Sequence, residues 1–404
     1  MNRWVWALVG VAGLAVALRN GPLFLLSLFL ALIAGAALLW SRVCLEGVTY
    51  QRRFGSTRLF YGEETDLHIE IANAKPLPLA WLRAEDELPR SLSLAPARLT
   101  PSHRPGRQRL VNLLSLRWYE RVTRRYRVQG AQRGAWTFGP VELLSGDIFG
   151  FSIQRLAPAE VDELLVYPRL VSLAALGLPA DRPFGEFRAL RRLAEDPLRL
   201  SGARAYAPGD SMRHIHWKAT AHRSELQTKT FDASANRPLA LFLNINTFEH
   251  VWEGLDPDLQ EYAITATASL ARWAWEQGQP VGLYANAVTQ PGARTVRIRA
   301  ANHPDQLTLI LEALARVVPY GRWTMEETLR REALRLGYGT TVVAITAVMP
   351  DALRRTLLYL HDRGYALGLV TLGRAGTAPP LPGVRTYHIG GKEEWHQLTS
   401  LALT

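Results

Sequence analysis

The sequence of 404 residues contains a single cysteine, Cys44, and fewer acidic than basic side chains. One cysteine excludes an intramolecular disulfide and a zinc cluster built from several thiolates. Walker, EF-hand, His-Glu-x-x-His and Gly-x-Ser-x-Gly motifs are also absent from the sequence. We therefore predict no catalytic residues, no cofactor and no bound metal.

The charge balance is 47 basic against 36 acidic residues, a formal net charge of +11. Such an excess suits nucleic acid or an anionic membrane surface. No nucleic-acid-binding motif accompanies it, and basic residues on the cytoplasmic side of a membrane anchor account for it. We therefore expect no nucleic-acid partner.

Two apolar runs occupy residues 4–18 and 22–40. As helices they would be about 22 Å and about 28 Å long, so the second can cross a bilayer core and the first needs its flanks. The turn-forming sequence RNGP joins them. This pattern predicts a two-helix membrane anchor over residues 1–42, in contact with lipid.

Basic residues set the predicted orientation of this anchor. One lies in the loop (Arg19), and the others flank the pair of spans: Arg3, Arg42, Arg52, Arg53 and Arg58. The positive-inside rule then places the protein in the inner (plasma) membrane, multi-pass, with its soluble domains facing the cytoplasm. The alternative is a cleaved signal peptide ending near residues 15–17, with the second run as an anchor and the soluble part outside.

Period-two patterns follow the anchor and predict a β-sandwich over residues 43–161. In DLHIEIAN, Leu67, Ile69 and Ile71 alternate with more polar positions. In RVTRRYRVQ, at residues 121–129, apolar side chains share one face and arginines the other. That arginine face is either a solvated surface or a site for anions.

From residue 238 to residue 404, strand and helix patterns alternate. The runs LALFLNIN, PVGLYAN, TTVVAIT and ALGLVTL are typical of strands buried on both faces. Helical spacing is predicted over 258–277, 304–318, 351–363 and 392–403, with Val317 and Val318 on the apolar stripe of the second helix. The pattern predicts a doubly wound, mostly parallel α/β domain, so the fold class is multidomain: a transmembrane hairpin, an all-β sandwich and this α/β domain.

Residues 162–237 connect these domains and carry the sequence ARAYAPGDSMRHIHWKATAHR at 203–223. This sequence resembles the signature of the bacterial membrane-protein family catalogued as domain of unknown function 58, roughly Arg-x-Tyr-x-x-Gly-Asp-x-x-Arg-x-Ile-x-Trp-Lys followed by an Ala-Arg pair. RGAWTFGP and GDIFG, within residues 133–150, resemble that family too. The matching residues are Arg204, Tyr206, Gly209, Asp210, Arg213, Ile215, Trp217 and Lys218, and the pair reads Ala221-His222-Arg223, one residue longer than usual.

The resemblance implies two N-terminal spans, a β-sandwich, a C-terminal von Willebrand factor A-like domain, and an association with MoxR-type AAA+ ATPases and transglutaminase-like membrane proteins. An A-like domain usually carries Asp-x-Ser-x-Ser after its first strand, to hold Mg²⁺. Here those positions are Asn244, Asn246 and Phe248, and Asp351 after a later strand is a weak replacement. Because Mg²⁺ prefers hard oxygen ligands that include a carboxylate, we predict no tight metal site and metal-independent partner binding.

The signature sequence suits a joint between domains, or a docking surface beside it, better than a catalytic site. We predict that Asp210 caps a helix beginning at Ser211, that Arg204 and Arg213 form bidentate salt bridges, and that Trp217 wedges this helix against a neighbouring domain. The residues assigned to this joint or docking surface are Arg204, Tyr206, Gly209, Asp210, Arg213, His216, Trp217, Lys218 and Arg223.

These features together predict a membrane-anchored, non-enzymatic scaffold or adaptor that binds other proteins through cytoplasmic domains and works with a MoxR-type AAA+ ATPase. Two alternatives stay open. One is a membrane-tethered, metal-dependent hydrolase that uses His214, His216 and His222. The other is a module that binds anionic lipid or nucleic acid through the strand arginines Arg121, Arg124, Arg125 and Arg127.

Overall fold

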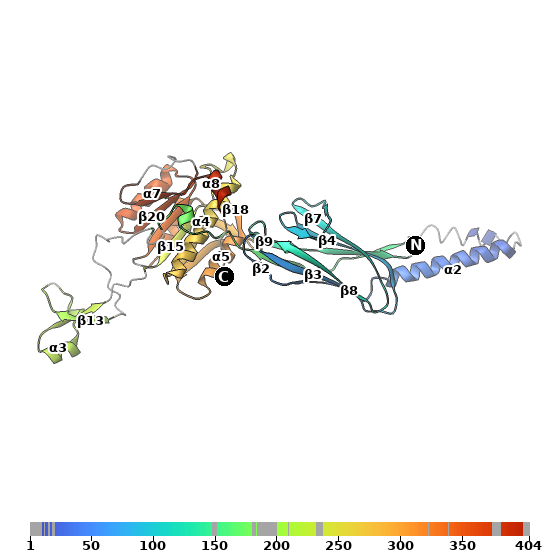
Figure 1. Ribbon diagram of the computed structural model, residues 1–404, viewed down its shortest axis with the longest axis horizontal. Helices are drawn as coiled ribbons and strands as arrows, with labels where there is room; N and C mark the ends of the chain where they lie inside the picture. The colour runs from blue at the N-terminus through green and yellow to red at the C-terminus, as the bar shows by residue number, and fades with distance from the viewer. Residues whose placement is uncertain are drawn as a thin grey trace. The chain divides into compact units, whose positions relative to one another are not determined.

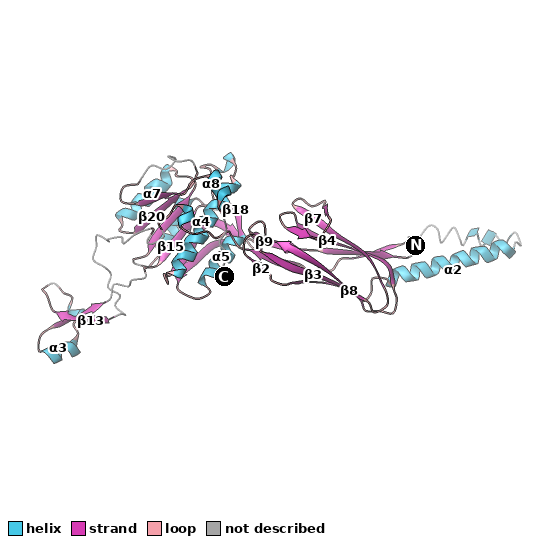
Figure 2. Ribbon diagram, in the orientation of Figure 1, coloured by secondary structure: helices cyan, strands magenta, loops and turns pink. Residues whose placement is uncertain are grey.

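The computed structural model of the chain describes residues 21–147, 152–179, 200–208, 210–231, 237–321, 323–337, 339–373 and 381–398, with the single residues 10, 11, 13, 14, 17 and 183. The chain divides into two compact units, Met1–Val166 and Tyr167–Thr404. Figure 1 follows the chain by colour, and Figure 2 distinguishes its helices from its strands.

Helix α2 (Gly21–Val43) is the one helix among the described residues that is long and apolar enough to cross a membrane. Its side chains are largely exposed, Leu25 at 65%. Just past its C-terminal end, Cys44 is fully buried in the core of the first unit, against which Trp40 also packs. The first predicted span, residues 4–18, lies mostly outside the described residues. The structure therefore supports one candidate membrane helix near the N-terminus.

Strands make up the rest of the first unit. One sheet has the order β1-β3-β8-β5, a second β11-β10-β4-β7-β6, and a small third β2-β12-β9. The first two sheets share one hydrophobic core, in which Leu67, Ile69 and Ile71 of β3 are fully buried, so the predicted alternation is confirmed. The strands are β1 (Val48–Phe54), β2 (Arg58–Leu59), β3 (Glu64–Asn73), β4 (Leu79–Pro89), β5 (Ser93–Ala95), β6 (Leu99–Pro101), β7 (Arg107–Leu116), β8 (Arg121–Gln129), β9 (Gly134–Phe138), β10 (Val141–Gly146), β11 (Ile153–Leu156) and β12 (Asp162–Val166).

Strand β4 carries three consecutive buried carboxylates at residues 85–87, each at most 7% exposed. The central one, Asp86, accepts hydrogen bonds from Arg52 Nε at 2.7 Å, Arg52 Nη2 at 2.8 Å and the Tyr50 hydroxyl at 2.8 Å. Arg52 also reaches Asp162 at 2.8 Å. Because a buried charge is costly unless it is paired, this ion pair fixes β1 against β4 across the two sheets.

A seven-stranded sheet forms the centre of the second unit, in the order β17-β16-β15-β19-β20-β21, with β18 paired to β16 off this path. Pairing is parallel from β16 through β15, β19 and β20 to β21, while β17 and β18 run antiparallel to β16. When β18, which lies off this path, is left out of the numbering, the order of the other six strands is 3-2-1-4-5-6, a doubly wound order whose switch point lies between β15 and β19. The strands are β15 (Leu239–Leu243), β16 (Val281–Thr289), β17 (Arg294–Ala301), β18 (Val317–Gly321), β19 (Thr341–Thr346), β20 (Ala366–Thr371) and β21 (Arg385–His388).

Helices cover both faces of this sheet. Ala240 and Phe242 of β15 join a core with α6 and α7. Leu241 points to the opposite face, where α4 packs on β15, and is also fully buried. The helical segments are η1 (Ala174–Leu176), η3 (Val251–Glu253), α4 (Pro257–Glu276), α5 (Gln306–Arg316), α6 (Met325–Ala333), α7 (Asp351–Asp362) and α8 (Lys392–Gln397).

Two predicted helices are too long. The helix predicted over 392–403 ends at Gln397, and residues 399–403 lie outside the described part of the chain. The helix predicted over 304–318 ends at Arg316, and the next residues form β18 on β16. Val317 and Val318 therefore belong to a strand rather than to a helical stripe, as β-branched side chains favour.

Candidate functional site

The signature sequence forms a small hairpin of its own. Strands β13 (Leu200–Ala205) and β14 (Gln227–Phe231) pair antiparallel, and between them lie the short helices η2 (Met212–His214) and α3 (Trp217–Arg223), as Figure 1 shows. We call residues 200–231 the signature hairpin. Gly209 lies outside the described residues.

Asp210 is the polar centre of the signature hairpin. Its Oδ1 accepts from Arg204 Nη2 at 2.6 Å, and its Oδ2 accepts from the Ala207 N–H at 3.0 Å and the Thr228 hydroxyl at 3.1 Å. Arg204 therefore forms a salt bridge, with Asp210 as its acceptor, but the contact is not the predicted bidentate one, because Arg204 Nη1 donates to Ala205 O at 3.1 Å. The predicted helix cap is wrong, because the Asp210 carboxylate closes the turn before η2 and ties that turn to β14. Tyr206 donates its backbone N–H to Leu226 O at 2.9 Å and continues the ladder.

These donors stabilise the charged form of the carboxylate. The hydrogen bond from Arg204, followed by that from Ala207, lowers the pKa of Asp210 from 3.8 to about 2. The side chain is 17% exposed. The network thus keeps its negative charge, and its link to Arg204, throughout the neutral and mildly acidic range.

The predicted single helix beginning at Ser211 is broken into two. Ile215 and His216 interrupt it: Ile215 is 2% exposed and bridges to Thr228 of β14, and the His216 N–H donates to Gln227 O at 2.8 Å. His216 Nδ1 then accepts from the Ala219 N–H at 3.1 Å and caps α3. Burying Ile215 against the hairpin has therefore overridden the helical spacing.

The large apolar side chains of the signature hairpin point outward. Trp217 is 67% exposed and Met212 is 66% exposed, and the wedge against a neighbouring domain stays a prediction. Arg213, Lys218 and Arg223 are exposed beside them. Within the described part of the chain Arg213 makes no ion pair, so its predicted salt bridge is not formed there.

Where β15 and β19 end, and beside them within β16, amide and hydroxyl side chains form a buried network. Asn244 is 4% exposed; its Nδ2 donates to Thr346 Oγ1 at 2.9 Å and its Oδ1 accepts from Asn286 Nδ2 at 2.8 Å. Asn286 Oδ1 accepts from the Ile245 N–H at 2.8 Å, and Thr346 Oγ1 donates to Val348 O at 2.6 Å. Both side-chain polar atoms of Asn244 are therefore engaged within the protein.

The other predicted rim positions lie outside this network. Asn246 is half-buried and donates only its backbone N–H to Asn244 Oδ1, at 3.2 Å, and Phe248 is 37% exposed. Asp351 lies in the first turn of α7, 3.1 Å from Arg354. Sequence reasoning missed Asn286 and Thr346, although each follows or ends an apolar strand run at the same sheet edge: PVGLYAN and TTVVAIT.

No group of three or more His, Cys, Asp or Glu side chains is arranged for a metal ion in the ranges that the structure describes. His214 ends η2 and His216 caps α3, so the pair is not the extended segment that would turn both rings to one face. This geometry does not favour the hydrolase alternative.

The arginine face of β8 is partly neutralised by β3. Arg121 lies 3.2 Å from Glu70, and Arg127 lies 3.5 Å from Glu64. Arg124 and Arg125 are exposed. Acidic neighbours weaken the attraction of this face for phosphates, which disfavours the lipid or nucleic-acid alternative.

Residues 202–360 match the family described as "Protein of unknown function DUF58". The "Uncharacterized protein YeaD" of Bacillus subtilis is 26% identical over 262 residues, which are 64% of this chain and 61% of that protein. The chain thus spans less than two thirds of this relative's length. These matches support the family that the signature resembles, and neither name states an activity.

Two solved structures are similar over 30% of this chain. One is a CARDB domain from Pyrococcus furiosus in complex with di-metal ions, with a TM-score of 0.20, 9% identity and 91% of that chain covered. The other is the cohesin module of a family 33 glycoside hydrolase from Clostridium perfringens, with a TM-score of 0.21, 11% identity and 95% covered. At such TM-scores the similarity carries no argument.

Proposed function

We propose that the chain is a membrane-anchored, non-enzymatic scaffold that binds another protein through the signature hairpin. The observation that carries this proposal is Trp217, 67% exposed on a segment whose backbone is held by its own hydrogen bonds. Tryptophan is enriched among the residues that dominate binding energy, and an ordered backbone lowers the entropic cost of binding.

The surface around Trp217 indicates the chemistry of its partner. Met212 adds apolar area, and Arg213, Lys218 and Arg223 border it with positive charge. A complementary partner presents an apolar pocket rimmed by acidic side chains. The family resemblance implies a MoxR-type AAA+ ATPase, and we propose this class as the partner, with a transglutaminase-like membrane protein as a second component.

The rest of the molecule is compatible with such a role. The apolar helix α2 supports membrane anchoring, and we extend it to a two-helix hairpin with both units in the cytoplasm. The doubly wound strand order supports a von Willebrand factor A-like domain. Because the amides of Asn244 and Asn286 are satisfied by each other and by their neighbours, we propose that partner binding does not use a metal there.

The test compares crosslinked complexes from native membranes that contain the natural protein, Trp217→Ala or the matched control Trp252→Ala. Trp252 is 81% exposed in η3, away from the signature hairpin in sequence, and stacks on His250. The expected result is that the ATPase co-purifies with the natural protein and the control, and falls at least tenfold with Trp217→Ala. An unchanged melting temperature is the folding check. If the two variants recover equal amounts of the ATPase, the hairpin is not the docking surface. If neither the natural protein nor a variant recovers it, the proposed scaffold function is wrong.

A further inference from the structure

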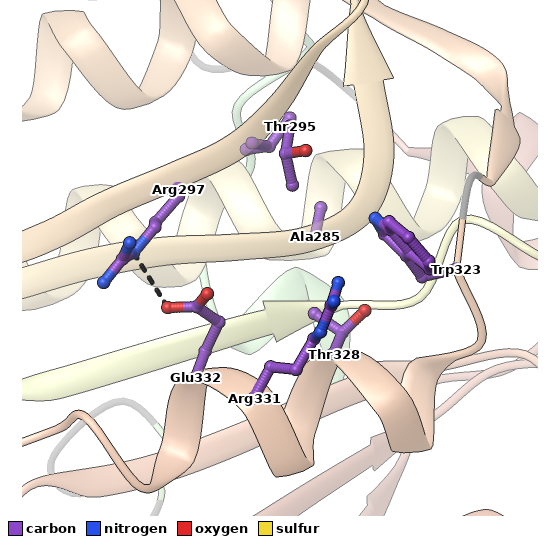
Figure 3. A pocket seen from close by; sticks show the side chains of 8 residues that line it. Ala285, Thr295, Arg297, Trp323, Thr328, Arg331 and Glu332 are labelled. Atoms are coloured by element: carbon purple, nitrogen blue, oxygen red, sulfur yellow. Dashed lines mark ion pairs between the residues drawn. The ribbon is translucent and has the colours of Figure 1, made fainter.

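A hollow lies in the second unit where the ladder between β16 and β17 is interrupted. Tyr284 pairs with Arg297, and the next pair is Val288 with Thr295, so two extra residues bulge from β16. The hollow has a volume of about 310 Å³ and opens between this bulge and α6, as Figure 3 shows. Bulges are common beside functional sites, where they redirect side chains.

The charges around the hollow leave one guanidinium without a counter-ion. Glu332 forms ion pairs with two arginines, Arg297 at 2.8 Å and Arg335 at 3.4 Å. Arg331 instead lies over the Trp323 ring, 4.4 Å from its centroid, and makes no ion pair with any described residue. Its remaining N–H groups are therefore available to an anion.

Trp323 is the one lining residue that combines a large apolar side chain with partial exposure. Ala285 is fully buried and Val296 is 4% exposed. The indole of Trp323 forms one wall, and Figure 3 shows Arg331 pointing from α6 into the space beside it, toward Thr295. The aromatic wall and the available guanidinium together select a ligand with a flat apolar body and an anionic head.

We infer that this hollow binds a small organic anion, an aromatic or similarly flat molecule whose carboxylate or phosphate head contacts Arg331 and whose body lies along Trp323. The volume is at the small end of ligand pockets, so the body is about one ring in size. This inference does not rest on the scaffold function, because the hollow lies outside the signature hairpin.

The test uses the full chain in lipid nanodiscs, with benzoate and phenyl phosphate as probes, benzyl alcohol as the uncharged control and calorimetric titration as the measurement. We expect saturable binding of at least one anion and binding of benzyl alcohol at least tenfold weaker. Arg331→Gln should weaken anion binding at least tenfold, because a charge-assisted hydrogen bond is lost. The matched control Arg330→Gln, an exposed arginine next to it on α6, should bind like the natural protein.

The comparison of the two probes identifies the preferred head group. No saturable binding of either anion, equal binding of benzyl alcohol, or equal binding by Arg331→Gln would each overturn the inference. Arg331 is exposed, so its substitution should leave the melting temperature unchanged. If the melting temperature of Arg331→Gln falls, Arg331→Lys replaces it in the test, because lysine keeps the charge without the planar guanidinium. Weaker anion binding by folded Arg331→Lys would then support the inference, and unchanged binding would overturn it.

Discussion

Asn244→Asp tests whether the carboxyl edge of the sheet has become a structural network or can still accept a metal. The substitution restores a carboxylate at the predicted metal position without changing side-chain shape. In the natural protein the Asn244 Nδ2 donates to Thr346 Oγ1, whose own proton is committed to Val348 O at 2.6 Å. A carboxylate oxygen would therefore face a hydroxyl oxygen that has no proton to give.

The cost follows from the contacts that change. The variant keeps the donors from Asn286 at 2.8 Å and from the Asn246 N–H at 3.2 Å, and loses one hydrogen bond worth about 1 kcal/mol. Holding a charge at a position that is 4% exposed costs several kcal/mol, which those two donors offset only in part. We expect a net loss of about 3 kcal/mol, or a fall in melting temperature of about 6 to 12 °C.

The assay is thermal unfolding in lipid nanodiscs, with EDTA and with excess Mg²⁺. The expected fall should be the same in both, because Asn246 and Phe248 replace the remaining ligand positions with an amide and a phenyl ring. Recovery of the melting temperature in Mg²⁺ would refute metal independence. No fall in EDTA would refute the hydrogen-bonded role of Asn244. Asn246→Asp, at a half-buried position, is the control and should cost clearly less.

Two further predictions concern the charged groups. Arg52→Leu leaves the fully buried Asp86 without its bidentate partner and should lower the free energy of unfolding, measured in urea, by about 3 to 5 kcal/mol. The control Arg53→Leu removes a surface contact of 3.9 Å to Glu70 and should lower it by less than about 1 kcal/mol. Equal losses in the two variants would contradict the role of the buried pair. Asp210 has a folded pKa of about 2, below its unfolded value of 3.8, so its contribution to hairpin stability is present above pH 3.8 and is lost as the pH falls toward 2. Pepsin should therefore cleave the signature hairpin faster in Asp210→Asn than in the natural protein at about pH 4, with the difference vanishing near pH 2; a difference that persists there would contradict the assignment.

Elements with one clear period were predictable from the sequence. Leu67, Ile69 and Ile71 alternate along β3, and the apolar run of β15 is buried at every position. The long helix predicted over 258–277 differs from α4 by one residue at each end. In these segments local periodicity and tertiary burial require the same conformation, so the pattern alone was sufficient.

Charged strands were not predictable in the same way. β17 has arginines at 294, 297 and 299 and forms a sheet edge, so it carries no apolar run. Three consecutive carboxylates, at residues 85–87, are typical of an exposed segment. They are nevertheless buried, because arginines distant in the sequence form ion pairs with them. Arg109 lies 24 positions from its partner Glu85, and Arg52 lies 34 positions from its partner Asp86. Only the folded register brings such pairs together.

The signature hairpin shows both outcomes within one segment. Arg204 and Asp210 were correctly paired, since a guanidinium six residues from a carboxylate across a Pro-Gly turn can reach it. The helix at Ser211 was wrong because Ile215 gains more from burial against β14 than from a continuous helix. The same break fixes α3 by its own cap at His216 and leaves Trp217 facing outward.

Polar side chains whose hydrogen bonds are all made within the protein have a structural role here, whereas exposed or unpaired side chains mark the proposed binding sites. Asn244 and Asn286 use all their side-chain polar atoms internally, and a buried network in that state makes the sheet edge rigid. Trp217, in contrast, is 67% exposed, and Arg331 lies over the Trp323 ring without an ion pair to any described residue. The hydrogen-bonded backbone around Trp217 and the ring contact of Arg331 are already formed, so ordering these segments adds little entropic cost when a ligand binds. Binding is therefore expected at the hairpin and at the α6 hollow, and not at the edge where a metal would have been.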